Sequence, residues 1–195
     1  MTAIRLKQAA LTLFAESGYD GVSLSEIAKS VGIKTPSIYA HFESKEQLFL
    51  ELVADAVQEE HEKFMLLFKQ MADRPPIERY YAIFRFYTDL DELSKGQSFL
   101  RRTMLMPPRN VEERLRRTFA VYEDGVTAPM TGLLRECAGP GAFDDAQVER
   151  LLALFYAAID GLLVEHKLYD TEHYRRRQAL IWEWLQDSLR LERAR

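Results

Sequence analysis

The stretch from residue 23 to residue 49, SLSEIAKSVGIKTPSIYAHFESKEQLF, decides the fold of this chain. It holds several helix-start signals at short intervals. Ser23 and Glu26 have the spacing of a capping box, in which the serine hydroxyl accepts from the Glu26 backbone N–H and the glutamate carboxylate reaches back. Thr35 and Pro36 combine a capping hydroxyl with a proline at the first helical position. These signals predict two short helices close together in the chain.

A third start signal and a glycine set the lengths of these helices. Gly32 predicts the end of the first helix, and Ser44 with Gln47 forms a second capping box that begins a longer helix. A short helix, a turn that contains glycine and another short helix form a helix-turn-helix. Neither short helix is stable alone, so both need a shared core. We expect that core from Leu13, Phe14, Leu24, Ile27, Ala28, Val31, Ile33 and Ile38.

The composition of the 195 residues excludes several classes of protein. Hydrophobic residues make up 47% and charged residues 29%, which fits a globular chain with a buried core. The formal net charge of −4 disfavours a protein that coats nucleic acid without sequence preference. The single cysteine, Cys137, rules out an internal disulfide framework and a zinc site built on cysteines.

No stretch of the sequence has the length of a membrane span. The longest run without a charged residue is Gly125 to Leu134, which is far shorter than the ~20 apolar residues that a span needs. The first residues show no apolar core of a secretion signal. We therefore expect a cytoplasmic protein that has no membrane partner.

Helical periodicity continues through the chain, and runs of alternating strand-like residues are missing. Pro129 is expected to kink one long helix. Helix caps are expected at Asn110 with Glu113 and at Asp144 with Gln147. The pattern predicts about nine helices. Besides the two short ones, they cover about 3–17, 45–71, 76–93, 97–106, 110–137, 145–168 and 171–192.

Residues 10–49 resemble the DNA-binding domain of the TetR/AcrR family of bacterial repressors. The pattern GIxxxxIYxHFxxKxxL, which begins at Gly32, carries this resemblance. The resemblance implies an all-α protein with a helix-turn-helix DNA-binding domain over residues 1–46. It also implies a helical ligand-binding and dimerising domain over residues 47–195, entered through a long helix that begins near Lys45.

The hydroxyl groups of the second short helix suit contacts with DNA. Thr35, Ser37 and Tyr39 lie on its early turns, where hydroxyls can reach base edges or phosphates. The resemblance assigns base reading to residues 34–37. The expected DNA contacts are Ser23, Ser25, Lys34, Thr35, Pro36, Ser37, Tyr39, His41 and Lys45.

Single residues of this region also have purely structural interpretations. Tyr39 and Phe42, taken alone, fit ordinary core aromatics, and His41 alone fits a structural histidine. The resemblance assigns Tyr39, His41 and Lys45 to the DNA backbone. At the position of Ser25 the family often has arginine, which would bond a guanine through two hydrogen bonds. Serine cannot do so, and we expect the operator to be read differently there.

The chain beyond residue 76 carries features of a ligand cavity and of a dimer interface. Its many aromatic residues and methionines suit a bulky hydrophobic ligand. The candidate cavity residues are Tyr81, Phe84, Phe99, Met104, Phe119 and Tyr122. The predicted helix 145–168 is apolar almost all round, so it needs cover from its own core and from a partner chain. The candidate interface residues are Phe155, Ile159, Leu162, Leu163, Ile181 and Leu185.

Together these features predict a homodimeric transcriptional repressor. Two recognition helices would enter major grooves about 34–36 Å apart on a palindromic operator. A small hydrophobic or aromatic ligand would release the protein from the DNA. The alternative is a module of the same fold that recruits a protein partner without a small-molecule inducer. No motif in the sequence supports an enzyme, a cofactor or a metal site.

Overall fold

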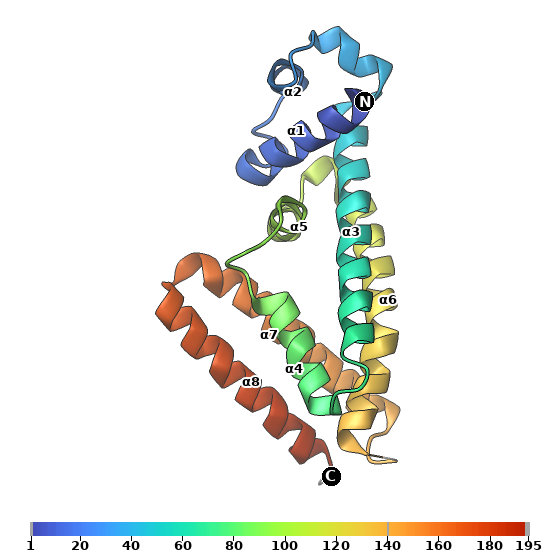
Figure 1. The fold of residues 1–195 in the computed structure, drawn as a ribbon, viewed down its shortest axis with the longest axis vertical. Coiled ribbons are helices and arrows are strands. Elements are labelled where there is room, and N and C mark those ends of the chain that lie inside the picture. The colour runs from blue at the N-terminus through green and yellow to red at the C-terminus, as the bar shows by residue number, and fades with distance from the viewer. Residues whose placement is uncertain (1, 140, 194–195) are drawn as a thin grey trace. The chain divides into compact units, whose positions relative to one another are not determined.

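The computed structural model describes residues 2–139 and 141–193, and within them the chain is helical throughout and has no strand (Figure 1). The predicted all-α class is confirmed, and each predicted helix is found, together with one additional 3-10 turn. None of the described helices has the length and apolar character to cross a membrane. The elements are α1 (Thr2–Ser17), α2 (Leu24–Ser30), η1 (Thr35–Ala40), α3 (Lys45–Gln70), α4 (Pro76–Thr88), α5 (Lys95–Leu105), η2 (Arg109–Val111), α6 (Glu112–Ala138), α7 (Asp145–Leu168) and α8 (Thr171–Arg193).

The chain folds into two compact units. The first consists of Met1–His61 and Leu93–Tyr122, and the second of Glu62–Glu92 and Glu123–Arg195. The first unit is larger than the DNA-binding domain expected over residues 1–46, because α5 packs against α1. Helices α3 and α6 each contribute residues to both units.

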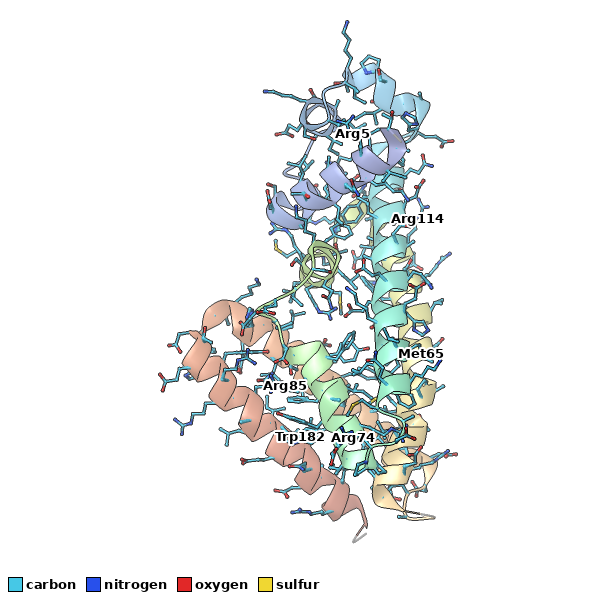
Figure 2. All side chains as sticks on the ribbon, in the orientation of Figure 1. Arg5, Met65, Arg74, Arg85, Arg114 and Trp182 are labelled. Atoms are coloured by element: carbon cyan, nitrogen blue, oxygen red, sulfur yellow. The ribbon has the colours of Figure 1, made fainter. Side chains whose placement is uncertain are left out.

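In the second unit, α4, α7 and α8 pack against one another. The Trp182 side chain of α8 lies among three aromatic rings of α4 (Figure 2). Its ring centroid is 5.4 Å from that of Tyr80, 4.8 Å from that of Tyr81 and 5.5 Å from that of Phe84. Separations of this size give aromatic pairs a stabilisation beyond the burial of their area. The aromatic residues of α4 are therefore largely used to hold α8.

Helix α4 ends five residues earlier than the predicted residue 93, at Thr88. The Thr88 carbonyl accepts hydrogen bonds from the Tyr174 hydroxyl (2.6 Å) and from the Gln178 side-chain amide (3.1 Å) of α8. Gln178 also donates to the Thr88 hydroxyl oxygen at 2.8 Å. These long-range donors replace the helical N–H that would otherwise satisfy the carbonyl. The periodicity of the sequence within α4 does not indicate these donors, which explains why the end of the helix was predicted too late.

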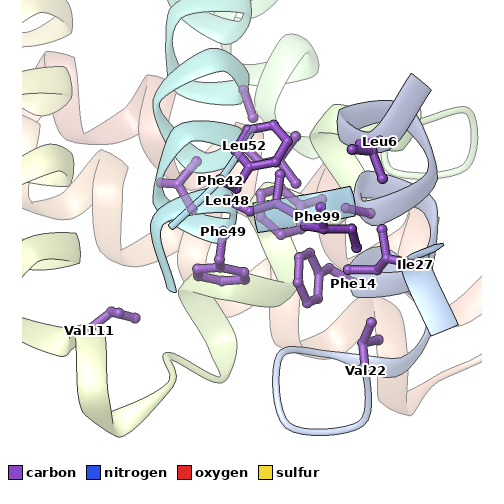
Figure 3. Close-up of a cluster of buried hydrophobic side chains, with 14 of the residues drawn as sticks. Leu6, Phe14, Val22, Ile27, Phe42, Leu48, Phe49, Leu52, Phe99 and Val111 are labelled. Atoms are coloured by element: carbon purple, nitrogen blue, oxygen red, sulfur yellow. The ribbon is translucent and has the colours of Figure 1, made fainter. Parts of the chain in front are cut away.

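The core of the first unit joins α1, α2, η1, α3 and α5 (Figure 3). On α1 the buried residues Leu6, Ala10 and Phe14 are spaced by four, so they form one stripe. The Phe14 ring meets Phe49 of α3 edge-on at 5.2 Å, and Phe49 meets Phe99 of α5 in the same way at 5.2 Å. This aromatic row explains why α5 belongs to the unit that carries the helix-turn-helix.

Several of the predicted local signals are confirmed. Ser23 and Glu26 form both halves of the capping box of α2, and Asp144 with Gln147 does the same for α7. Gly32 follows α2 with φ of +76°, in the left-handed region that disfavours other residues. Helix α6 is continuous through Pro129, and the expected kink there stays a prediction.

The cap predicted at Thr35 is wrong. The N-cap residue is Lys34, whose φ of −82° and ψ of 144° are extended, and no side chain caps this end. Thr35 is already helical, so its hydroxyl is not in a capping position. The element is a 3-10 helix, with Ser37 N–H donating to the Lys34 carbonyl at 2.9 Å. A six-residue helix between two turns favours this tighter winding.

Two further predicted caps need correction. Gln47 N–H donates to the Ser44 hydroxyl at 3.0 Å, as expected, but the Gln47 side-chain oxygen accepts from Glu43 N–H instead of Ser44 N–H. Asn110 does not cap α6, because it lies inside η2 and its side-chain amide donates to the Tyr19 hydroxyl at 3.0 Å. The polar side chain is used for a contact with a distant loop.

A buried ion pair lies in the first unit between α3 and α5. Glu60 is 1% exposed and Arg101 is 7% exposed, and the guanidinium of Arg101 pairs with the Glu60 carboxylate. The Gln97 side-chain amide donates to the second carboxylate oxygen of Glu60 at 3.1 Å. Removal of either charged partner from such a pair leaves a desolvated charge without compensation.

We predict that Arg101→Ala lowers the free energy of unfolding by about 3–5 kcal/mol, because Glu60 stays buried without its partner. Urea denaturation followed by circular dichroism measures this change. The matched control is Arg117→Ala, which removes the same charge from an exposed pair with Glu113 and should cost no more than about 1 kcal/mol. Equal losses in the two variants would contradict the assignment.

Candidate nucleic-acid interface

Helix η1 presents two exposed rows of side chains. A 3-10 helix has three residues per turn, so residues three apart lie above one another. Ile38 is fully buried and anchors the helix in the core. Pro36 and Tyr39 form one exposed row, and Ser37 with Ala40 forms the next. These rows are the surface that η1 offers to a binding partner.

The structure separates the two aromatic residues for which a core role was considered. Phe42 is buried in the core of the first unit, whereas Tyr39 is 58% exposed. The side chain of Tyr39 is therefore accessible to a phosphate. His41 and Ser25 are also exposed, and Thr35 is half-buried.

The cationic residues around η1 differ in whether they already bind another group of the protein. Lys29 of α2 and Lys34 are exposed, and neither has a hydrogen bond or an ion pair with any residue that the structure describes. Arg5 of α1 donates from its guanidinium to the Val31 carbonyl at 3.1 Å and so holds the turn between α2 and η1 (Figure 2). The two lysines are thus available to phosphates, while Arg5 positions the turn.

Lys45 has a structural role that the sequence did not reveal. Its ammonium donates to the carbonyl of Tyr19 at 2.7 Å and to that of Val22 at 2.8 Å. It also lies over the Tyr19 ring, 4.1 Å from the centroid. Two of its three protons are therefore committed to the loop between α1 and α2, and one remains for a phosphate. No local signal indicates this contact, because the partners lie 26 and 23 residues away.

Ser23 is committed as well. Its hydroxyl and its backbone N–H both donate to one carboxylate oxygen of Glu26, each at 2.7 Å. The hydrogen bonds from Ser23 lower the pKa of the Glu26 carboxyl, which keeps a negative charge at the start of α2. Neither donor of Ser23 is free for a phosphate while the capping box is formed. The capping role of Ser23 is thus confirmed, and its DNA contact stays a prediction.

Comparison with known proteins agrees with this geometry. Residues 6–52 match the model of the bacterial regulatory proteins of the tetR family. Residues 6–52 therefore resemble the DNA-binding domain of the tetR family, and the resemblance predicted over residues 10–49 is confirmed. Relatives are the negative regulators IcaR of the biofilm operon icaADBC in Staphylococcus epidermidis, 38% identical over 85 residues, and in Staphylococcus aureus strain Newman, 37% identical over 84 residues. Each match covers 43% of this chain and 44% of the relative, so the chain matches less than half the length of these curated proteins.

Solved structures of TetR-like fold extend the likeness to almost the whole chain. FadR of Bacillus subtilis, solved with stearoyl-CoA, has a TM-score of 0.69 at 20% identity and covers 95% of this chain and 98% of its own. A transcriptional regulator of Saccharomonospora viridis, solved with choline, has a TM-score of 0.68 at 20% identity. The match covers 93% of this chain and 95% of the other. At this identity the likeness concerns the fold.

The candidate cavity residues, which were predicted from the aromatic and methionine content, are divided between the two units. Tyr81 and Phe84 lie in the second unit against Trp182. The other four lie in the first unit, where Phe99 is fully buried in the core and Met104 is exposed. Phe119 packs against that core, and Tyr122 is half-buried. Neither unit therefore contains all six residues.

The expected interface residues are mostly buried inside the second unit. Phe155, Leu162, Leu163 and Leu185 are buried within the single chain, and Ile159 and Ile181 are half-buried. The four buried residues have no surface left for a partner, so their assignment is corrected to the core. The apolar character of α7 on several sides did show that more than one face needs cover, but it could not show which face packs inside the chain.

We predict that Lys45→Met lowers the free energy of unfolding by about 1.5–3 kcal/mol, because the carbonyls of Tyr19 and Val22 lose charge-assisted hydrogen bonds. Thermal unfolding monitored by circular dichroism measures the change. Lys34→Met is the control, since Lys34 has no partner to lose and surface changes of this kind stay within about 0.5 kcal/mol. The structural role of Lys45 is refuted if both variants unfold like the wild type.

Proposed function

We propose that this protein is a homodimeric transcriptional repressor that binds a palindromic operator and leaves it when a small molecule binds. The observation that carries the proposal is the exposed surface of η1, held by the buried Ile38, in a region that matches the tetR family. The negative regulation printed for the Staphylococcus relatives supports repression. Because operator DNA lies in the bacterial cytoplasm, we place its action there.

On DNA, η1 would enter the major groove with its exposed rows toward the bases. Ser37 and Pro36 suit base edges, and the Tyr39 hydroxyl suits a phosphate oxygen. Lys34 and Lys29 would neutralise phosphates as point charges. The net charge of −4 means that these few cations, rather than a basic protein as a whole, must provide the attraction.

We predict that Lys34→Ala weakens DNA binding and lowers the slope of log affinity against log salt by about 0.9, the share of one phosphate. Tyr39→Phe should cost about tenfold in affinity through the loss of one hydrogen bond to a charged group. Fluorescence anisotropy with a duplex selected from a random-sequence pool measures both effects. Lys167→Ala, which removes the same charge from α7, is the control and should bind like the wild type. A salt slope unaltered by Lys34→Ala would contradict the contact.

The dimer interface that we propose uses the exposed apolar residues of α7 and α8. Val164 and Leu168 lie four residues apart on α7, as do Leu180 and Trp184 on α8, so each pair shares a helix face. Leu168 is 67% exposed and Trp184 is 52% exposed. Large apolar side chains that stay exposed on two helices that pack together favour an interface with a second chain. A twofold dimer would also match a palindromic operator.

Sedimentation at micromolar concentration should give a mass near twice 22.7 kDa. We predict that Leu180→Glu together with Trp184→Glu converts the dimer to a folded monomer, because each carboxylate would be buried without a partner. Leu66→Glu is the control, since Leu66 is equally exposed on α3, outside the proposed interface. A wild-type monomer at these concentrations would remove the interface and, with it, the palindromic operator.

Ligand release is supported by the fold relatives solved with stearoyl-CoA and with choline. A ligand can release the protein only if it binds a conformation with low DNA affinity more tightly than the DNA-binding conformation. Helices α3 and α6 supply residues to both units, so each can transmit a change along its own backbone. If no small molecule alters DNA affinity, the chain is instead a module that recruits a protein partner.

A further inference from the structure

A surface cavity lies within the first unit, outside the predicted ligand residues. Its volume is about 770 Å³. It is bounded by the end of α1, the loop that follows α1, and the segment from the end of α5 to η2. Small-molecule sites in proteins have volumes of roughly 300–1,000 Å³, so the cavity can hold an organic molecule of ordinary size. We call it the α1–α5 cavity.

Two guanidinium groups line the α1–α5 cavity without an acceptor from the protein. Arg102 is half-buried and Arg109 is exposed, and neither forms a hydrogen bond or an ion pair with a residue that the structure describes. Asp20 is the one carboxylate among the described lining residues, and it pairs with neither arginine. A guanidinium group has the geometry to form two parallel hydrogen bonds with a carboxylate or a phosphate. The lining therefore favours an anion.

The backbone next to Arg102 leaves space for this guanidinium. Gly18, which ends α1, has φ of +73°. A Cβ at this position would lie 3.0 Å from Nε of Arg102, which is tighter than nine in ten real Cβ contacts, so the Arg102 side chain would have to shift by a few tenths of an ångström. The glycine thus fits the left-handed end of the helix and also keeps Arg102 beside the cavity.

Apolar side chains form another part of the lining. Phe14 and Phe49, whose buried rings Figure 3 shows in the core, lie behind the cavity. Leu105 and Met106 are exposed side chains at the end of α5, and Pro107 follows them. We propose that the α1–α5 cavity binds an organic anion with an apolar body, whose charged group pairs with Arg102 and Arg109 while the body covers the exposed side chains of Leu105 and Met106.

A ligand here would touch the residues that position the helix-turn-helix. Tyr19 and Asn110 both line the cavity, and the Asn110 amide donates to the Tyr19 hydroxyl. The Tyr19 carbonyl and ring hold Lys45 at the start of α3. A ligand that displaces Asn110 from Tyr19 would alter this loop and, through it, the placement of η1. This consequence rests on the proposed function, whereas the binding site itself does not.

Calorimetric titration of the full chain with sodium 2-naphthoate tests the site, and neutral 2-naphthamide serves as the matched ligand. We predict that naphthoate binds at least tenfold more tightly than naphthamide. Arg102→Gln should weaken naphthoate binding about 10–100-fold, the effect of a hydrogen-bonded charge pair. The variant should fold like the wild type, because Arg102 has no partner to lose, and Arg109→Gln provides a second test at the rim. Arg117→Gln, an equal change of charge on α6, should leave binding unaltered.

The proposal is overturned if millimolar naphthoate does not bind, if naphthamide binds as tightly, or if Arg102→Gln binds naphthoate like the wild type. Anisotropy with the selected duplex then tests the link to DNA. Saturating naphthoate should change DNA affinity in the wild type but not in Arg102→Gln. Unaltered DNA affinity would remove the effector role of the cavity. If no duplex is selected with or without ligand, the proposed function fails, while calorimetry still decides whether the site exists.

Discussion

The ammonium of Lys45 makes the contact on which the helix-turn-helix depends. It joins the first turn of α3 to the Tyr19 and Val22 carbonyls, and so fixes the loop between α1 and α2 relative to the helix that follows η1. Two carbonyl acceptors and an aromatic face offset the cost of partly desolvating the charge. Ile38 can then anchor η1 in a core whose walls keep their positions. The family pattern contains this lysine within the DNA-binding motif, and in this chain its contacts show that it also builds the domain.

The features that the sequence predicted well depend on contacts within a few residues. The capping box of Ser23 and Glu26 and the glycine after α2 both involve neighbours in the chain. Their geometry follows from residue type and spacing, because helix ends and helix faces repeat every few residues. For the same reason the number and order of the helices could be predicted, and so could the exposed hydroxyls of η1.

The features that could not be predicted depend on distant partners. Asn110 has the spacing of a cap, yet its amide reaches Tyr19, 91 residues away. Phe155 and Leu168 both lie on the apolar helix α7, but one is buried in the chain and the other is exposed. Periodicity measures how many faces of a helix are apolar, and only tertiary packing decides which of them a neighbouring helix covers. Aromatic residues of α4 and α5 were expected around one cavity, whereas they belong to separate cores.

The proposed DNA surface and the α1–α5 cavity share one feature, which is that both contain cations without a carboxylate partner. In the first unit, Lys7 pairs with Glu51 and Asp55, Arg101 with Glu60, and Arg114 with Glu46. Among the described residues of this unit, Lys29, Lys34, Arg102 and Arg109 have no acceptor. In an acidic chain, carboxylates are plentiful, so cations without one mark places where an external anion can bind. Lys29 and Lys34 lie beside η1, whereas Arg102 and Arg109 line the α1–α5 cavity. Tyr19 also lines the cavity, and its carbonyl accepts a hydrogen bond from Lys45. If both proposals hold, one compact unit would offer two anion-binding surfaces, and an anion bound in the cavity would act on the loop that holds Lys45 and thereby on the placement of η1.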